Sequence, residues 1–479
     1  MRKIPQKLKL GVATAAFQIE GAWNVADKTP SIWDTFCHKA NYIKDGTTAD
    51  DACKSYEFYQ RDIKMLKYLG VDFYRFSISW PRVLPNGFSN IISQDGVEYY
   101  NKLINGLLAN GIEPVVTIYH WDLPQNLQDL GGWANPLIAD WFEDYSRVLF
   151  EAFGDRVKTW ITLNEPKQFG IFGYGTPRFA PEIVSAGIGD YLVVKNLLLA
   201  NARAWHLYDK KFREKQKGVC GITIATDFRE GATDSPSDME TGNLVIDFEV
   251  GLYSHPIFSS TGGFPERVVK QVAEKSAKQG FPRSRLPELS PDEVEFIKGT
   301  SDFYGFNHYS TQFYTEDHYK PGMFPIPSYQ DDMGAVGSYL DYEIAPIPHT
   351  TSIPSGIRKA LNWVRVNYNN PPIMITENGY GTFGGLNDAV RVKYFKEYIN
   401  AVLDAIEDGC DVITYTAWSL IDNFEWALGQ SAKFGLFEVD FADDKRTCKA
   451  RTSALWYRHL IAKRTLDPHY EPEFEEVTF

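Results

Sequence analysis

The sequence lacks a long apolar run and has only five cysteines among its 479 residues. No apolar stretch approaches the roughly 20 residues that a membrane-spanning helix needs, so no membrane span is expected. The cysteines stand singly, with no CxxC pair and no histidine at metal-ligand spacing. This pattern predicts reduced, mostly buried thiols without excluding one disulfide, and it predicts neither a metal site nor a cofactor.

An excess of positive charge is also absent. The 49 Lys and Arg residues stand against 62 Asp and Glu residues, a formal net charge of −13, which disfavours nucleic acid and anionic membranes as partners. The sequence has no Asn-x-Ser/Thr sequon, and its start, Met1-Arg-Lys-Ile-Pro5, is not followed by the apolar segment of a signal peptide. These features predict a cytoplasmic protein as the sequence stands, or a secreted one if it is a mature fragment. They leave a homodimer open.

Strand-like segments alternate with helix-like segments along the whole chain. The predicted strands are Leu8–Thr14, Phe73–Trp80, Glu113–His120, Val157–Asn164, Val219–Thr226, Phe303–Tyr309, Pro372–Thr376 and Val412–Trp418. The predicted helices are Ser55–Leu69, Val97–Asn110, Pro136–Phe153, Asp190–Glu214, Ser290–Lys298, Ile357–Tyr368, Asp388–Asp408 and Thr452–Lys463. No internal linker rich in Gly, Ser or Pro interrupts them, so the order predicts an α/β fold, a single (β/α)8 TIM barrel forming one domain over residues 1–479.

A doubly wound parallel sheet is the alternative to the barrel. It would need a Gly-rich phosphate-binding turn after an early strand, and the sequence has none. Two connections, Thr226–Arg285 and Ser310–Pro354, are too long for ordinary strand-to-helix loops. Long loops at the carboxyl-terminal face of a barrel commonly shape the entrance for a substrate, and we expect that role here.

Two of the predicted strands end in a glutamate. The segments Ile161-Thr-Leu-Asn-Glu165-Pro166 and Ile373-Met-Ile-Thr-Glu377-Asn378-Gly379 begin with the apolar and β-branched residues of buried strands. A single strand-end glutamate would more often be a salt-bridge partner. Two of them at the carboxyl-terminal ends of barrel strands are the paired carboxyl groups of a glycosidase, one an acid and the other a nucleophile.

The other strand ends carry hydrogen-bonding side chains and indoles. In chain order these are Gln18, Arg75, His120, Asn164, Asn307, Tyr309, Trp418, Glu425 and Trp426. A pyranose needs both kinds, because its hydroxyls bind carboxylates and amides while its C–H face packs on an aromatic ring. Taken singly, Arg75 could be a structural ion pair, Trp418 a core residue and His120 a buried core histidine. Trp121 is interpreted as packing and is left out of the site.

Four segments resemble glycoside hydrolase family 1, the β-glucosidases of the (β/α)8 barrel type. They are Gln18–Trp23, Thr162–Pro166, Thr376–Gly379 and Trp418–Trp426, and the similarity covers nearly the whole chain. The sequences of the segments Ile118–Pro124 and Asp422–Ala427 most resemble those of animal, insect-like members of the family. The resemblance implies a metal-free retaining β-glucosidase whose substrate is a small β-glycoside.

The resemblance also implies a role for each residue of the site. Glu165 matches the general acid/base and Glu377 the nucleophile, with their carboxyl groups about 5–5.5 Å apart. Arg75 and Tyr309 match the residues that contact the nucleophile. The implied substrate-binding residues are Gln18, His120, Asn164, Asn307, Trp418, Glu425 and Trp426, with Asn164 at the 2-hydroxyl and Trp418 beneath the sugar. Glu425, as a charged acceptor, suits the 4- and 6-hydroxyls of glucose, galactose or fucose-like sugars.

At several positions the residue differs from that of particular family members, and these differences limit the expected substrates. Plant thioglucosidases of the family have Gln at the acid/base position, where this chain has Glu165, and 6-phosphoglycosidases have Ser in place of Glu425. These differences favour an O-glycosidase acting on an unphosphorylated sugar. Many relatives place a tryptophan platform for the aglycone near His349, so we expect a different aglycone here, although the role of His349 stays open.

Two alternatives to the β-glucosidase remain. A myrosinase-like thioglucosidase would need a basic residue such as Lys167 for the sulfate of a glucosinolate, whereas a solvated lysine is an equally good interpretation. Gln312 stands where a sulfate-binding arginine would be expected, which weakens this alternative. A non-catalytic sugar-binding member of the family would have lost one or both glutamates, and both Glu165 and Glu377 are present.

Overall fold

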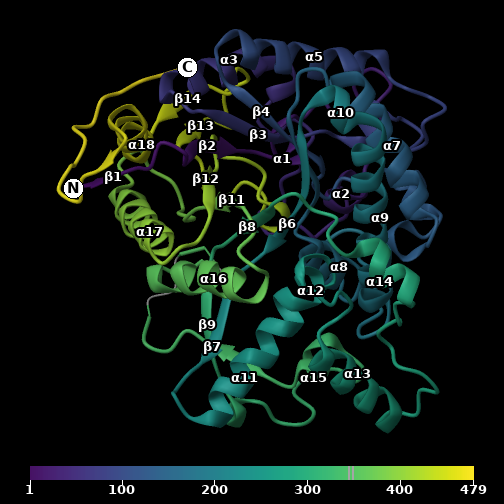
Figure 1. The fold of residues 1–479 in the computed structure, drawn as a ribbon. Coiled ribbons are helices and arrows are strands. Elements are labelled where there is room, and N and C mark those ends of the chain that lie inside the picture. The colour runs from purple at the N-terminus through teal and green to yellow at the C-terminus, as the bar shows by residue number, and fades with distance from the viewer. Residues whose placement is uncertain (343–345, 348–349) are drawn as a thin grey trace.

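Eight parallel strands close into a barrel in the computed structural model, which describes residues 1–342, 346–347 and 350–479 (Figure 1). In barrel order they are β2 (Lys9–Ala13), β3 (Phe73–Ser77), β4 (Glu113–Tyr119), β5 (Thr159–Asn164), β6 (Val219–Ala225), β8 (Tyr304–Asn307), β11 (Ile373–Asn378) and β12 (Val412–Trp418). β12 pairs in parallel with β2, which closes the circle. The predicted (β/α)8 barrel and its eight strands are confirmed.

Helices surround the barrel at the predicted places. They are α3 (Ser55–Leu69), α5 (Gln94–Ala109), α7 (Ile138–Phe153), α9 (Gly189–Leu207), α14 (Pro291–Ile297), α16 (Pro354–Asn367), α17 (Ala389–Glu407) and α18 (Thr452–Lys463). Helix α3 ends as its sequence predicts, because Gly70 adopts a left-handed φ of 74° and its N–H binds the carbonyl of Leu66. The predicted helix Asp190–Glu214 is helical throughout, but a π-helical turn at Tyr208–Phe212, which was not predicted, separates α9 from α10 (Arg213–Gln216).

An apolar layer fills the barrel near the amino-terminal ends of its strands. Phe73, Val115, Ile161, Phe303 and Met374 form this cluster, and each is buried. These side chains come from β3, β4, β5 and β11 and from the residue before β8. The cluster fills the barrel axis here, and the predicted site residues lie at the opposite, carboxyl-terminal end.

The two long connections fold against each other outside the barrel. β7 (Phe228–Gly231), after β6, pairs in parallel with β9 (Thr311–Thr315), after β8, and β10 (Val336–Ser338) adds to β9 in an antiparallel manner. The first connection also holds α11 (Pro236–Ile246), α12 (Leu252–Phe258) and α13 (Glu266–Lys278), and the second holds α15 (Tyr329–Met333). In Figure 1, β7, β9, α11, α13 and α15 lie together below the barrel.

Shorter elements complete the described chain. They are β1 (Arg2–Lys3), α1 (Ala16–Ile19), α2 (Ile32–Cys37), α4 (Trp80–Val83), α6 (Gln125–Asp129), α8 (Pro166–Tyr174), β13 (Phe437–Val439), β14 (Cys448–Ala450) and β15 (Thr465–Leu466). All five cysteines are buried and unpaired, as predicted. Among the helices that the structure describes, none is both long and apolar enough to cross a membrane.

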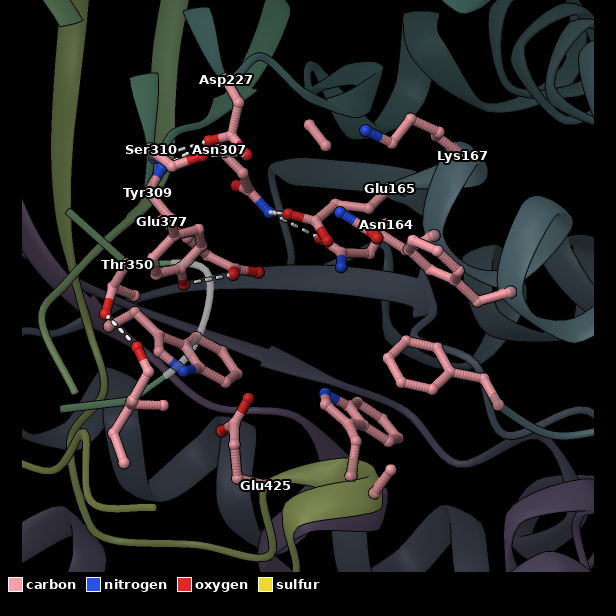
Figure 2. Close-up of a pocket in the computed structure, with 18 of the residues that line it drawn as sticks. Asn164, Glu165, Lys167, Asp227, Asn307, Tyr309, Ser310, Thr350, Glu377 and Glu425 are labelled. Carbon is pink, nitrogen blue, oxygen red and sulfur yellow. Dashed lines mark hydrogen bonds between the residues drawn. The ribbon is translucent and has the colours of Figure 1, made fainter. Parts of the chain in front are cut away.

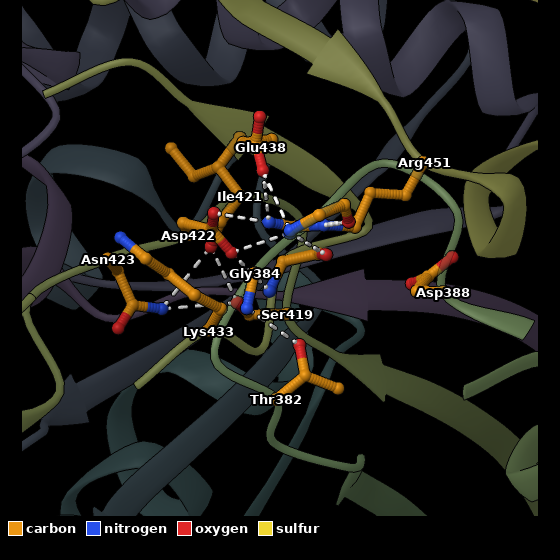
Figure 3. A network of polar contacts seen from close by, with 12 residues as sticks. Thr382, Gly384, Asp388, Ser419, Ile421, Asp422, Asn423, Lys433, Glu438 and Arg451 are labelled. Carbon is orange, nitrogen blue, oxygen red and sulfur yellow. Dashed lines mark hydrogen bonds and ion pairs between the residues drawn. The ribbon is translucent and has the colours of Figure 1, made fainter. Parts of the chain in front are cut away.

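A buried ion-pair network holds the loop that follows β12 (Figure 3). Arg451 donates from both terminal nitrogens to the carboxylate of Asp422, at 2.7 and 2.8 Å, and neither side chain is exposed. Arg451 also donates to Glu438 at 3.1 Å, and the N–H of Gly435 donates to Asp422 at 3.0 Å. The network therefore ties both ends of the loop 419–436 to the start of α18.

Arg391 of α17 adds a second clamp on the same loop. Its guanidinium binds Asp388 at 2.6 Å and donates to the carbonyls of Gly435 and Lys433, each at 2.8 Å. The hydroxyl of Ser453 donates to the same Asp388 carboxylate oxygen at 2.6 Å. The loop that carries Glu425 is thus fixed by two buried arginines.

Replacing Arg451 by Met should strongly destabilise the protein. The change leaves the Asp422 carboxylate buried without its cation, a situation that typically costs about 3–5 kcal/mol. Urea unfolding of the wild type and the variant measures the difference. Arg358→Met is the matched control, because its pair with Asp408 at 2.7 Å lies at the surface and should contribute far less. Equal losses in the two variants would contradict a special role for the buried network.

Candidate active site

A cavity of about 540 Å³ opens at the carboxyl-terminal end of the barrel. Nine of the eleven predicted site residues line it: His120, Asn164, Glu165, Asn307, Tyr309, Glu377, Trp418, Glu425 and Trp426. The other two, Gln18 and Arg75, are fully buried behind the wall and bind residues that line it. Figure 2 shows Glu165 and Glu377 near the middle of the cavity, with Glu425 at one end and Asp227 and Lys167 toward the other.

Glu377, in β11, is held by a cation and a phenol. Arg75 donates to one carboxylate oxygen at 2.7 Å, and the Tyr309 hydroxyl donates to the other at 2.7 Å. Arg75 comes from β3 and also donates to the carbonyl of Thr376 at 2.9 Å. These are the partners of an ionised carboxylate, because each donates a hydrogen bond to it and one carries a positive charge.

Glu165 follows the last residue of β5 and begins the turn into α8. Its backbone has a left-handed φ of 48°, which a residue other than glycine adopts at a cost in energy. Asn307 donates to its carboxyl oxygen at 2.8 Å. Burial, followed by the negative charge of Glu377, raises the pKa of Glu165 to about 8, against the lowering effect of Asn307. This environment therefore favours the protonated form of the carboxyl group.

A network of amides connects the two glutamates. The side-chain oxygen of Asn164 accepts from Arg75 at 2.6 Å and from Asn307 at 3.2 Å. Its nitrogen lies 3.0 Å from Nε2 of His120. Burial, followed by the charge of Arg75, holds the pKa of His120 well below its usual value, so the ring is neutral. Because Nε2 accepts from Asn164, the ring proton stands on Nδ1.

Two buried polar atoms beside this network have no hydrogen-bond partner among the described residues. They are Oε1 of Gln18 and Nδ1 of His120. Gln18 uses its nitrogen to donate to Asn423 at 3.0 Å and to Glu425 at 3.3 Å. A buried acceptor and a buried donor left unpaired are costly.

Glu425 lies at the end of the cavity nearest Gln18. The sequence predicts a charged acceptor here, whereas burial, followed by the charge of Glu377, raises the pKa of Glu425 to about 8. Trp418 and Trp426 line the cavity around it, and the ring of His120 stacks against both indoles at 6.0 and 5.9 Å. This end of the cavity combines flat apolar surfaces with hydrogen-bonding groups.

Trp121 was interpreted as packing, and the structure gives it a larger part. It lines the cavity, packs on Trp426 with ring centres 4.4 Å apart, and donates from its indole to the carbonyl of Asn164 at 2.8 Å. Its φ of 82° is also left-handed, as is the φ of 48° at Trp426. Together with Glu165, three non-glycine residues of the site therefore have strained backbones. The signal in the sequence that pointed to Trp121 was its position directly after His120.

A charged group on the other side of the cavity was largely missed. The sequence left the role of Lys167 undecided between a sulfate ligand and a solvated lysine. In the structure its side chain is only 10% exposed and its Nζ lies 3.1 Å from Glu249. Arg229 binds the same Glu249 oxygen at 2.6 Å, and Asp227 accepts from the backbone N–H of Tyr309 at 2.8 Å. Asp227 and Arg229 follow directly on β6, so charged residues after that strand were a readable signal. His349 lies outside the described residues.

One group of potential metal ligands occurs among the described residues, and it lies away from the cavity. Ligand atoms of Cys37, His38 and Asp50 fall within 4.8 Å of one another. Burial raises the pKa of the Cys37 thiol to about 12, so the thiol is protonated, and His38 lies 2.7 Å from Asp50. A protonated thiol is a poor metal ligand, and no part of the site geometry depends on this group.

Two carboxyl groups in opposite environments at the carboxyl-terminal end of a closed barrel define a class of enzyme, the glycoside hydrolases. The model of glycosyl hydrolase family 1 matches residues 1–466, and the chain belongs to that family. The resemblance inferred from the sequence is thereby confirmed.

Individual relatives agree with this assignment. Myrosinase 1 of Brevicoryne brassicae is 43% identical over 463 residues, covering 96% of this chain and 98% of the relative. The human cytosolic β-glucosidase is 41% identical over 468 residues, covering 95% and 97%. Among solved structures, an aphid myrosinase has a TM-score of 0.92 at 43% identity, covering 96% and 99%. A rice β-glucosidase has a TM-score of 0.89 at 36% identity, with the same coverage.

Proposed function

We propose that this glycoside hydrolase is a retaining β-glucosidase. The main support is the contrast between the two carboxyl groups. Glu377 accepts hydrogen bonds from Arg75 and Tyr309, whereas Glu165 is buried and its pKa is raised to about 8. Acid and nucleophile can be told apart on this basis, since an acid must keep its proton and a nucleophile must be charged.

The reaction then proceeds in two displacements. The Glu377 carboxylate attacks the anomeric carbon, the bond from that carbon to the leaving oxygen breaks, and Glu165 gives its proton to that oxygen. Glu165, now ionised, takes a proton from a water molecule, which attacks the anomeric carbon and releases Glu377. Two inversions restore the starting configuration of the sugar.

The glucosyl unit occupies the end of the cavity around Glu425. Gln18, His120, Glu425 and Trp426 bind its hydroxyls in this proposal, with Trp418 beneath the ring. The unpaired Oε1 of Gln18 and Nδ1 of His120 support it, because a sugar hydroxyl can both donate to the first and accept from the second. Asn164 takes the 2-hydroxyl, and Asn307 orients Glu165. We expect fucosides and galactosides to be cleaved more slowly than glucosides.

The thioglucosidase alternative has a named relative in the aphid myrosinase, yet two observations favour O-glycosides here. Lys167 and Arg229, two of the basic residues that line the cavity, are already paired with Glu249, at 3.1 and 2.6 Å. Gln312, an uncharged residue, lines the cavity where a sulfate-binding arginine was expected. The non-catalytic alternative is disfavoured because both glutamates are present in the site.

A cytoplasmic location is also proposed. Five buried, unpaired thiols and the likeness to the human cytosolic enzyme support it. The homodimer and the single domain over residues 1–479 stay predictions.

Replacing Glu377 by Ala should abolish hydrolysis of aryl β-glucosides, because no group remains to attack the anomeric carbon. Azide should restore part of the activity, and the product should be the α-glucosyl azide, since the anion enters from the vacated side. NMR of the product gives the configuration. An Ala variant with wild-type turnover would exclude Glu377 as the nucleophile.

The acid role of Glu165 should appear in the pH profile. Since the pKa of Glu165 is raised to about 8, its proton is present below that value and activity falls as pH rises through it. In Glu165→Ala supplied with azide, which needs no base, this alkaline limb should disappear for a dinitrophenyl glucoside. A limb that persists unchanged in the variant would assign it to another group.

Glu425 should determine how strongly the enzyme prefers substrates whose sugar carries a 6-hydroxyl group. Glu425→Ser removes a carboxyl partner, and a lost hydrogen bond of this kind lowers kcat/KM by about 10-fold or more. The loss should be much larger for a β-glucoside than for a β-xyloside, which has no 6-hydroxyl group. Equal losses on both substrates would mean that Glu425 supports the loop without contacting the sugar.

A further inference from the structure

The wall of the cavity opposite Glu425 is built from four charged side chains, here called the ion-pair wall: Lys167, Asp227, Arg229 and Glu249. Figure 2 shows Lys167 and Asp227 on the far side of Glu165 from Glu425. If the glucosyl unit lies around Glu425, as in the proposed function, the leaving group lies against this wall. The role of the wall therefore rests on the proposed function.

The four charges neutralise one another. One oxygen of Glu249 receives both Lys167, at 3.1 Å, and Arg229, at 2.6 Å. Asp227 lies 3.5 Å from Arg229 and accepts from two backbone N–H groups, those of Tyr309 at 2.8 Å and Ser310 at 2.9 Å. Burial alone would raise the pKa values of Asp227 and Glu249, but nearby cations, Arg229 first among them, hold both below normal, so both acids are ionised. Two positive and two negative charges leave the wall without net charge.

The wall nevertheless keeps hydrogen-bonding capacity toward the cavity. Among the described residues, Glu249 is the only ion-pair partner of Lys167, whose ammonium carries three N–H groups. The contacts of Lys167, at 3.1 Å, and of Arg229, at 2.6 Å, are made to the same Glu249 oxygen. Donors and acceptors therefore stand side by side, which is the arrangement that suits a hydroxyl group, itself both donor and acceptor.

Aromatic rings face part of the same space. Phe172 and Phe179 line the cavity, and their ring centres lie 5.5 Å apart. The guanidinium of Arg178 lies over the ring of Phe172 at 4.7 Å. A leaving group between these surfaces would meet apolar rings and the polar ion-pair wall, so it should have both a flat or C–H-rich face and hydroxyl groups.

We propose that the ion-pair wall selects leaving groups that are uncharged and carry hydroxyls, with Lys167 as a donor to a leaving-group oxygen. An anionic group placed against the ion-pair wall is disfavoured, because it would approach two carboxylates while both cations of the wall are already paired. A leaving group without hydroxyl groups cannot form hydrogen bonds with the ion-pair wall and therefore binds more weakly. Sugars and hydroxylated phenols fit this chemistry.

A matched pair of substrates tests the selection on the wild-type enzyme. They are 4-(hydroxymethyl)phenyl β-glucoside and 4-carboxyphenyl β-glucoside, which carry a hydroxyl or a carboxylate at the same place. We expect kcat/KM to be about 10-fold higher or more for the hydroxymethyl compound, the effect of one charge-assisted hydrogen bond. Glu249→Gln gives the wall one net positive charge and should shift this ratio toward the carboxylate. A wild type that prefers the carboxylate would overturn the proposal.

Lys167→Met tests the donor. The fall in kcat/KM should be at least about fivefold larger for cellobiose, whose leaving group is a sugar, than for phenyl β-glucoside, whose leaving group has no further hydroxyl. Lys195→Met is the control, because it breaks a comparable pair with Glu293 at 2.8 Å outside the cavity and should leave the ratio unchanged. Equal falls on the two substrates would refute the role of Lys167. A wild type inactive on phenyl β-glucoside would refute the proposed function itself.

Discussion

The buried guanidinium of Arg75 is the interaction on which the site depends. From β3 it donates to Thr117 of β4, Asn164 of β5 and Glu377 of β11, so one cation joins four of the eight strands where they end. A fully buried cation is stable only when its donors are satisfied by such partners. Its charge also lowers the pKa of His120, after the larger effect of burial, and opposes the rise at Glu165. Arg75 therefore contributes both to the geometry of the site and to the pKa values of His120 and Glu165.

Much of this arrangement could be predicted because barrel topology converts sequence position into spatial position. Residues that follow a buried parallel strand must lie at one end of the barrel, whichever strand they follow. Glu165 and Glu377 are 212 positions apart, yet both follow apolar runs, so their meeting in one cavity was predictable. The helices were equally predictable where a regular apolar period ends in a glycine, as at Gly70.

The features that could not be predicted depend on how loops pack and on how deeply groups are buried. Glu249 comes from a π-helical turn, Asp247–Gly251, inside a long connection, and no local pattern predicts its meeting with Lys167. The protonation of Glu425 could not be predicted from its own segment, because it depends on burial and on Glu377, which lies in β11. The irregular end of the helix that starts at Gly189 was missed since its composition remains helical beyond Leu207.

The apolar cluster at the amino-terminal end of the barrel determines where substrate enters and products leave. It consists of Phe73, Val115, Ile161, Phe303 and Met374. It closes the barrel axis on the side of the amino-terminal strand ends, so substrate, water and both products must pass through the carboxyl-terminal end. In the proposed reaction, the leaving group occupies the outer part of this blind passage. In that reaction water gains access to the inner sugar only after the leaving group has departed, and the sugar is the last to exit. An internal layer of five side chains would thus fix the order of events in the proposed catalytic cycle.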